Sequence, residues 1–281
     1  MISNSLSPLR YPGGKTKIYE RVKNLIVACN YTERTYVEPF AGGFGIGLKL
    51  LSEEIIESAV LNDIDRHIYH FWHSVLRNTD ALCDMIENVR ISIEERANQK
   101  IIYANKESTP LEDGFATLFL NRVNYSGVIK GGPIGGLEQN GEYSLGCRFN
   151  KEDIIRRIKA VAALKRRIKL RNSDAIKIIN DSAKNKFGEC LLYIDPPYIE
   201  KGSQLYTNYY KEKEHIKLAE RIRRVLQRDV PWFMTYDDSE LIKGAYQDFH
   251  IENYNLMHNA GGSVEGKEIV ITNIPDNLFL W

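Results

Sequence analysis

Asp195, Pro196, Pro197 and Tyr198 form an acceptor-rich run directly after an apolar stretch at residues 191–194. Because the prolines lack N–H donors, the run offers the Asp195 carboxylate and the Pro196 carbonyl as acceptors. An exocyclic amine has two N–H donors that fit this pair, and holding both favours a pyramidal nitrogen with an available lone pair. Tyr198 offers a face for base stacking, which contributes about 1–3 kcal/mol in nucleic-acid complexes. The run predicts an amine-binding site, and the alternative is a turn that ends a strand.

A glycine-rich run at residues 38–47 follows a short β-prone stretch at residues 35–37. Glycines after a strand let the backbone approach a cofactor, and the N-terminus of a following helix favours an anionic group. Asp63 lies 21 residues after Gly42 and directly follows a second expected strand at residues 59–61. An acidic residue at this distance is suited to hold ribose hydroxyls. The run therefore predicts cofactor binding, with glycines in a packing turn as the alternative.

The glycine pattern differs from that of nicotinamide-dependent dehydrogenases, since Leu48 occupies the position of the third glycine or alanine. A dehydrogenase is accordingly a less favoured interpretation. Residues 10–15 form a second glycine-containing turn, Arg-Tyr-Pro-Gly-Gly-Lys. Lys15 is suited to pair with a cofactor carboxylate and Tyr11 to lie against an apolar or cationic group. A surface turn is the alternative.

The composition of the 281 residues, 43% hydrophobic and 27% charged, is typical of a globular chain with one large domain or one domain carrying an insertion. No apolar stretch is long enough to span a bilayer, and residues 1–10 lack the apolar core of a signal peptide. The four cysteines show no CxxC spacing, which argues against a zinc site or a disulfide framework. We therefore expect a cytoplasmic protein without membrane contact.

Two βα halves must position these motifs. The first half includes an expected helix from about residue 45 to residue 57. The second half begins with a helix capped by Asn150, with Asp153 three residues on as in a capping box. Further elements are expected near residues 168–170, 191–194, 216–226 and 232–235. The alternation predicts an α/β fold with a doubly wound, mostly parallel sheet.

A middle segment of different chemistry separates the halves. Residues 121–127, Asn-Arg-Val-Asn-Tyr-Ser-Gly, precede a glycine-rich stretch at residues 131–136. We expect this composition to exclude a helix and to form a hairpin or an extended recognition loop. The expected domains are a cofactor-binding half at 1–74, an inserted target-recognition region with the hairpin at 75–150, and a target-base half at 151–281.

Basic side chains gather at residues 148–171 although the net charge is only +1. They are Arg148, Lys151, Arg156, Arg157, Lys159, Lys165, Arg166, Arg167, Lys169 and Arg171. Such a segment forms either a phosphate-binding face or a solvated helix face.

In their order along the chain, these motifs resemble those of the Dam-like α-group adenine-N6 DNA methyltransferases, which use S-adenosylmethionine. The resemblance rests on residues 11–15, 38–44, 62–65 and 195–198, and residues 121–127 are similar to the family's DNA-contacting hairpin. It covers nearly the whole chain. It implies a Rossmann-like methyltransferase fold with an inserted target-recognition domain, and site-specific methyl transfer to a flipped-out adenine.

The resemblance also implies roles for individual residues. Asp195, Pro196 and Tyr198 would be catalytic and hold the target adenine. The cofactor-binding residues would be Tyr11, Lys15, Glu38, Phe40, Ala41, Gly42, Asp63 and Asp174. The DNA-binding residues would be Arg122, Asn124, Tyr125 and Ser126. Asp174 would accept a hydrogen bond from the amine of the cofactor's adenine or, alternatively, cap a helix.

Cofactor and partners follow from the same resemblance. We expect S-adenosylmethionine without a metal, double-stranded DNA as substrate, a monomer, and a cognate restriction endonuclease where the chain serves a restriction–modification system. The alternatives are methylation of cytosine N4, RNA or protein glutamine, or a DNA-binding module without catalysis. Aspartate at position 195 and the segment 121–127 favour DNA adenine. Residues 235–239 depart from the family pattern and take no role, and no recognition sequence is transferred.

Overall fold

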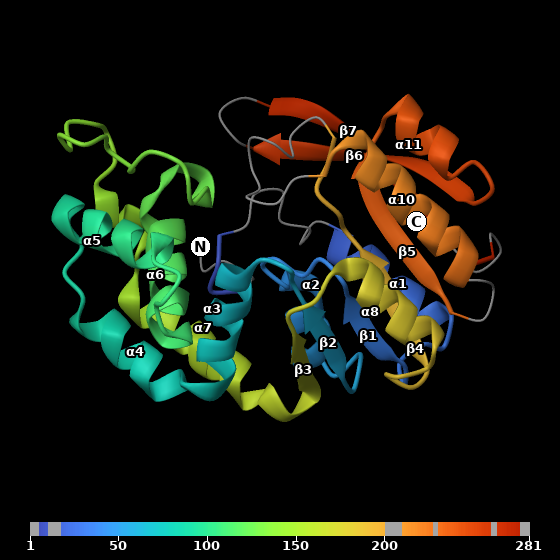
Figure 1. Ribbon diagram of the computed structural model, residues 1–281, viewed down its shortest axis with the longest axis horizontal. Helices are drawn as coiled ribbons and strands as arrows, with labels where there is room; N and C mark the ends of the chain where they lie inside the picture. Colours follow the sequence, from blue (N-terminus) through green and yellow to red (C-terminus); the bar gives the residue numbers. More distant parts are fainter. Residues whose placement is uncertain (1–5, 11–17, 200–209, 227–229, 260–262, 276–281) are drawn as a thin grey trace. The chain divides into compact units, whose positions relative to one another are not determined.

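The computed structural model forms two compact units (Figure 1). One unit comprises residues 15–41, 50–64 and 167–281, and the other comprises residues 1–14, 42–49 and 65–166. The structure describes residues 6–10, 18–199, 210–226, 230–259 and 263–275. Within these described ranges, no helix combines the length and the apolar character needed to cross a membrane.

A seven-stranded sheet, ordered β3-β2-β1-β4-β5-β7-β6, forms the centre of the first unit (Figure 1). Its strands are β1 (Thr35–Glu38), β2 (Ala59–Asn62), β3 (Ile168–Arg171), β4 (Cys190–Ile194), β5 (Trp232–Asp237), β6 (His250–Asn259) and β7 (Ser263–Thr272). Strands β1 to β5 pair in parallel, whereas β7 is antiparallel to β5 and β6. The predicted α/β fold with a mostly parallel sheet is confirmed. The strand order reverses between β1 and β4, and ligand sites of such sheets lie at the carboxyl ends beside this reversal.

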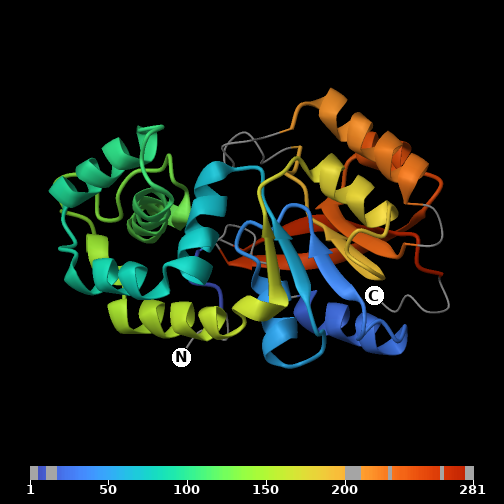
Figure 2. The ribbon, with the colours of Figure 1, turned by 60° about the horizontal axis from the view of Figure 1, so that its bottom comes forward.

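Helices cover both faces of the sheet, as Figure 2 shows. They are α1 (Tyr19–Ala28) on one face, and α8 (Ala175–Ala183), α10 (Glu212–Val225) and α11 (Glu240–Ala245) on the other. Successive side chains of a strand point to opposite faces. Alternate strand residues such as Leu192 and Met234 therefore pack with Ile178 of α8 and Ile222 of α10 in one buried cluster.

The predicted elements of the two halves occur, and most differences lie at their ends. The predicted strands are present with one or two additional residues, and Asn150 caps α7 (Lys151–Ala163) by accepting a bond from the Asp153 N–H. The helix expected over residues 45–57 stops earlier, as α2 (Gly45–Ser52). It ends there because Glu54 takes a positive φ of 58° and the Ile55 N–H closes the turn onto the Leu50 carbonyl at 3.0 Å.

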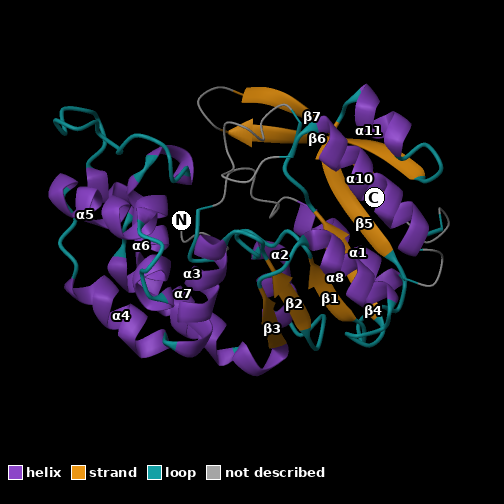
Figure 3. Ribbon diagram, in the orientation of Figure 1, coloured by secondary structure: helices purple, strands orange, loops and turns teal. Residues whose placement is uncertain are grey.

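The second unit is helical, and Figure 3 shows no strand among its described residues. Its main helices are α3 (Arg66–Arg77), α4 (Thr79–Asn88), α5 (Ile93–Ala104), α6 (Pro110–Val123) and α7. Helix α6 is buried on all sides from Asp113 to Val123, with α3 and α5 packed against it. Residues 115–120 are apolar apart from Thr117, so the middle of the helix suits this central position. Thr109 and Glu112 cap its start reciprocally.

The expectation that residues 121–127 exclude a helix is wrong for the first three, which form the last turn of α6. The Asn121 amide binds both the N–H and the carbonyl of Arg10 at 2.7 Å, so tertiary contacts override the local turn propensity. A short 3-10 turn, Tyr125–Gly127, follows. A single antiparallel bridge between Asn124 and Pro133 takes the place of the expected hairpin strands. Residues 75–150 all lie within this helical unit.

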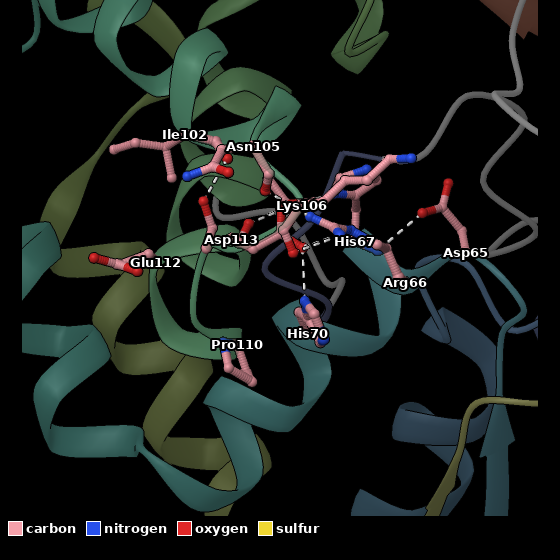
Figure 4. A network of polar contacts seen from close by, with 12 residues as sticks. Asp65, Arg66, His67, His70, Ile102, Asn105, Lys106, Pro110, Glu112 and Asp113 are labelled. Carbon is pink, nitrogen blue, oxygen red and sulfur yellow. Dashed lines mark hydrogen bonds and ion pairs between the residues drawn. The ribbon is translucent and has the colours of Figure 1, made fainter.

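Asp113 of α6 has no exposure to solvent and binds two histidines of α3 (Figure 4). His67 Nδ1 lies 2.6 Å and His70 Nδ1 lies 2.7 Å from its carboxylate oxygens, and Arg66 Nε lies 3.8 Å away. The His67 ring stacks on Tyr103 of α5, with ring centroids 3.7 Å apart. This cluster therefore joins α3, α5 and α6.

We expect Asp113→Ala to lower the free energy of unfolding by about 2–3 kcal/mol, because it removes hydrogen bonds to a buried carboxylate and leaves two imidazoles without their partner. Denaturant unfolding followed by circular dichroism measures the loss. Asp84→Ala, an exposed position on α4, is the matched control and should change the stability by less than about 0.5 kcal/mol. Equal stabilities of the two variants would show that the cluster does not hold the helices together.

Candidate active site

Asn62, at the end of β2, ties together the loops that follow the two neighbouring strands β1 and β3. This residue ends β2 and is buried. Its Nδ2 donates to the carbonyls of Pro39 at 2.8 Å and Ser173 at 2.9 Å, and its Oδ1 accepts from the Ser173 N–H at 3.0 Å. Its own carbonyl accepts from the Ala41 N–H at 2.9 Å. One side chain at the end of β2 thus joins the loops after β1 and β3.

These loops carry three of the predicted acidic residues. Glu38 is the buried last residue of β1, and Asp63 directly follows β2. Burial, and then the nearby Glu38 carboxyl group, raise the pKa of Tyr36 well above its ordinary value. Asp174 follows β3 and caps α8 by accepting from the Ile176 N–H at 2.8 Å. The structure therefore places one carboxyl group at the carboxyl end of each of β1, β2 and β3.

Aromatic and apolar side chains lie among the same loops. Phe40 contacts Tyr210 edge-on, with ring centroids 5.7 Å apart. Burial raises the pKa of Tyr210, and the Asp174 and Glu214 carboxylates add to the shift. Ile64, directly after Asp63, has an exposed fraction of 50%. Sequence reasoning did not single out Tyr210 or Ile64.

Of the four remaining residues predicted to bind the cofactor, the structure describes two. Tyr11 and Lys15 lie outside the described residues. Ala41 is buried, and Gly42 takes a positive φ of 47°, which glycine adopts without strain.

Asp195 is fixed by a hydroxyl group from the neighbouring strand. It directly follows β4, and its Oδ1 accepts from Thr235 Oγ1 of β5 at 2.8 Å. Because Thr235 donates to Asp195, the Tyr193 hydroxyl must be the donor in its 2.9 Å bond with Thr235. Pro196, the next residue, is buried. A chain of two hydroxyl groups thus orients the carboxylate from the sheet interior.

Tyr198 is fixed at its hydroxyl and at its ring. The hydroxyl donates to Glu268 Oε2 of β7 at 2.9 Å, and the ring stacks on Tyr236 with centroids 5.9 Å apart and planes 26° apart. Burial, followed by the negative charge of Asp195, raises the pKa of Tyr198 well above its ordinary value. The phenol therefore stays protonated and remains a donor. The following Ile199 N–H donates to Asp237 Oδ1 at 3.4 Å.

The four predicted DNA-binding residues divide into two buried and two exposed ones. Arg122 donates to the carbonyls of Pro8 and Arg148, and burial lowers the pKa of its guanidinium to about 10. Asn124 is buried and bonded through both ends of its amide, accepting from Arg96 Nε at 2.7 Å. Tyr125, with an exposed fraction of 55%, and Ser126 lie on the surface of the helical unit.

Comparison with known proteins decides the family. The model of the D12 class N6 adenine-specific DNA methyltransferases matches residues 11–259. The chain belongs to this family. It is also 23% identical over 266 residues to the Type II methyltransferase M.MjaIII of Methanocaldococcus jannaschii, covering 87% of this chain and 89% of that protein.

The solved structures that the chain matches include the rRNA methyltransferase aviRa of Streptomyces viridochromogenes. One structure of that enzyme has a TM-score of 0.39 and 10% identity, covering 93% of this chain and 85% of that chain. A second has a TM-score of 0.32 and 11% identity, covering 88% and 82%.

As a D12 class methyltransferase, the protein methylates the N6 amine of adenine in DNA, as predicted from its motifs. The family uses S-adenosylmethionine, and the donor set of the described residues fits that molecule. Carboxyl groups after β1, β2 and β3 suit its hydroxyl and amine donors, while Phe40, Tyr210 and Ile64 suit its apolar and cationic parts.

Three polar residues to which the sequence analysis gave no role bind the segment that follows β4 in the D12 methyltransferase. Thr235 and Asp237 end β5 beside β4, so their position after a strand was a usable signal. Glu268 lies inside the antiparallel strand β7, where no local pattern marks it. Its neighbours are set by the register of the sheet.

Most of the basic segment has structural partners. Arg157 donates to the Ser7 carbonyl, and Arg167 binds the carbonyls of residues 51, 56 and 57. Lys159, Lys165 and Arg166 remain exposed. The basic segment of the methyltransferase thus includes two arginines that bind the backbone of the protein itself.

Proposed function

We propose that this methyltransferase binds S-adenosylmethionine beside the carboxyl ends of β1, β2 and β3 and receives a flipped-out adenine at Asp195. The observation that carries this proposal is the placement of Asp195 directly after β4, and of Tyr198 three residues later, next to β1, where the strand order reverses. Sites of open α/β sheets lie at this reversal. The cofactor and base sites would therefore adjoin.

The chemistry at Asp195 follows from its acceptors. S-adenosylmethionine supplies, when bound, an electrophilic methyl group on a sulfonium sulfur. Asp195 and the Pro196 carbonyl each accept a hydrogen bond from the adenine amine. The nitrogen lone pair is then released from the ring and can attack the methyl carbon in line. The methylated amine would then release its surplus proton to solvent water, so Asp195 need not act as a strong base. The transfer requires no metal and no covalent enzyme intermediate.

The target base must leave the duplex before this contact can form. Flipping costs a few kcal/mol, which contacts in the pocket must offset. Stacking on Tyr198 supplies about 1–3 kcal/mol of this. The held position of the ring against Tyr236 means that little side-chain entropy is lost on binding.

On the helical unit we assign DNA contact to Tyr125 and Ser126 and a supporting role to Arg122 and Asn124. The two exposed side chains follow α6 directly, whereas the two buried ones have their polar groups bonded within the unit. Arg96 also donates to the Gly131 carbonyl at 2.9 Å, which holds the following loop.

We expect Tyr125→Ala to weaken binding of double-stranded DNA by about 10-fold, since one stacking or wedging aromatic is worth about 1–3 kcal/mol. Fluorescence anisotropy with a duplex that contains the recognition site measures the affinity. Tyr143→Ala, which removes a comparably exposed tyrosine (52%), shows whether the effect is specific to position 125. An unchanged affinity of the Tyr125 variant would remove this turn from the DNA interface.

The biological setting is a further part of the proposal. A relative that carries the description Type II methyltransferase supports a role in a restriction–modification system with a cognate endonuclease. We propose that the protein acts as a monomer on double-stranded DNA in the cytoplasm.

The whole proposal is tested by expression in a methylation-deficient bacterium, with the Asp195→Ala variant as control. Long-read sequencing maps the modified bases. N6-methyladenine at one recurring motif, absent with the variant, is expected and also identifies the recognition sequence. Methylation that persists in the folded variant would refute the role of Asp195.

A further inference from the structure

Glu268 is a buried carboxyl group that the chemistry of methyl transfer does not itself require. The sheet register places it on β7 directly opposite Tyr254 of β6 and Asp237 of β5. Its exposed fraction is 5%. Burying a carboxyl group is unfavourable unless hydrogen bonds compensate, and a second carboxyl group directly opposite adds to the cost. Because burying the Glu268 carboxyl group is unfavourable in free energy, its hydrogen-bond partners indicate its role.

One carboxylate oxygen of Glu268 accepts hydrogen bonds from two tyrosine hydroxyl groups. Oε2 accepts from the Tyr198 hydroxyl at 2.9 Å and from the Tyr254 hydroxyl at 2.5 Å. Burial raises the pKa of both phenols far above the ordinary value, with the Glu268 carboxylate contributing to each shift. Both phenols are therefore donors, and the carboxyl group is held between them.

The bond from Tyr198 crosses from the segment after β4 to a strand two positions away in the sheet. The stacked partner Tyr236 supports one face of the Tyr198 ring but does not by itself prevent the ring from sliding in its own plane. The hydroxyl bond to Glu268 removes that freedom. A stacking platform for a base depends on a fixed ring plane.

We propose that Glu268 is a positioning residue for the target base: with Tyr254 as its second donor, it locks the ring of Tyr198 in the plane on which the flipped adenine stacks. This inference rests on the proposed role of Tyr198 as that platform. It adds β6 and β7, the two antiparallel strands, to the elements that build the base site.

The test compares Tyr198→Phe, Glu268→Ala and the double variant on a duplex that carries the mapped motif. Each single change removes the same hydrogen bond, so the single-turnover rate should fall by about 10-fold to 100-fold in each. The double variant should lose little more, because one interaction cannot be lost twice. Tyr254→Phe should show a smaller fall. S-adenosylmethionine affinity, measured by calorimetry, should stay unchanged in all four.

A fluorescent base distinguishes positioning from stability. With 2-aminopurine in place of the target adenine, wild-type protein should give the fluorescence of a base that is flipped and stacked on Tyr198, and the variants should give an altered signal. Glu252→Ala is the matched control, since its half-exposed carboxyl group on β6 faces His250 at 3.8 Å and not Tyr198. It should behave as wild type.

Two results would overturn the inference. If Tyr198→Phe keeps the wild-type rate and fluorescence while Glu268→Ala loses stability, Glu268 only supports the sheet. If the losses of the two single variants multiply in the double variant, the two residues act independently. Tyr198→Phe removes one oxygen atom, so it carries the test even if Glu268→Ala does not fold. Failure of the proposed function is seen separately, as wild-type rates in Tyr198→Ala.

Discussion

Asp195→Ala should lower the rate of methyl transfer by about 1,000-fold, the upper range for removing one preorganised hydrogen-bonding group from an active site. The alanine leaves the amine of the adenine with the Pro196 carbonyl alone, so the lone pair stays delocalised into the ring. It also deprives Thr235 of its acceptor. Rapid-quench measurement of tritiated methyl transfer under single-turnover conditions gives the rate.

Cofactor affinity separates this effect from damage to the fold. Because the proposed cofactor contacts lie after β1, β2 and β3, the dissociation constant of S-adenosylmethionine should be unchanged in the variant. Asp238→Ala is the matched control, since that carboxylate pairs with Lys243 at the surface. A variant at position 195 that retains more than about a tenth of the wild-type rate would contradict an effect of this size.

Asn62→Ala should lower the free energy of unfolding by about 3–4 kcal/mol. The change removes three hydrogen bonds of about 1 kcal/mol each and leaves the buried Pro39 carbonyl and the part-buried backbone of Ser173 without this partner. The loops after β1 and β3 also lose their common tie, so affinity for S-adenosylmethionine should fall together with stability. Urea unfolding and calorimetric titration measure the two effects.

Two asparagines provide a graded comparison. Asn172 donates to the carbonyls of Asp63 and Ile64 from an exposed position, and Asn172→Ala should cost less than about 1 kcal/mol. Asn88 bonds only within α4, and Asn88→Ala should be close to neutral. Equal losses at positions 62 and 172 would mean that burial of the amide does not set the cost.

The parallel part of the fold and the acidic side chains after its strands were predictable from sequence. Short apolar runs at residues 35–37, 59–61 and 191–194 each precede polar residues, and parallel strands bring such residues to one edge of the sheet. Glu38, Asp63 and Asp195 could be found because chain order and spatial position agree there.

The antiparallel part of the site could not be predicted in the same way. Glu268 meets Tyr198 because β7 lies between β5 and β6 in one particular register. A shift by one residue would turn the carboxyl group to the other face. Nothing local to residue 268 specifies that register, so the sequence pattern carried no signal.

The helical conformation of residues 121–123 could not be predicted for a related reason. Asn121 and Arg122 are typical turn or surface residues, yet they are bonded to Arg10 and Pro8, more than a hundred residues earlier in the chain. Local propensity gives only the conformations that a segment favours in the absence of distant contacts. The distant partner decided which one is populated.

The order of the strands also dictates when the sheet can close. The central pair joins Thr35 of β1 to Cys190 of β4, and almost the entire helical unit is encoded between them. On the ribosome, residues 65–166 emerge after β1 and β2 and before β4, and they make mainly local helical contacts, which form fast. The parallel core must wait for β4, so the edge of β1 that pairs with β4 stays uncovered while the helical unit is made and is exposed to aggregation during that time.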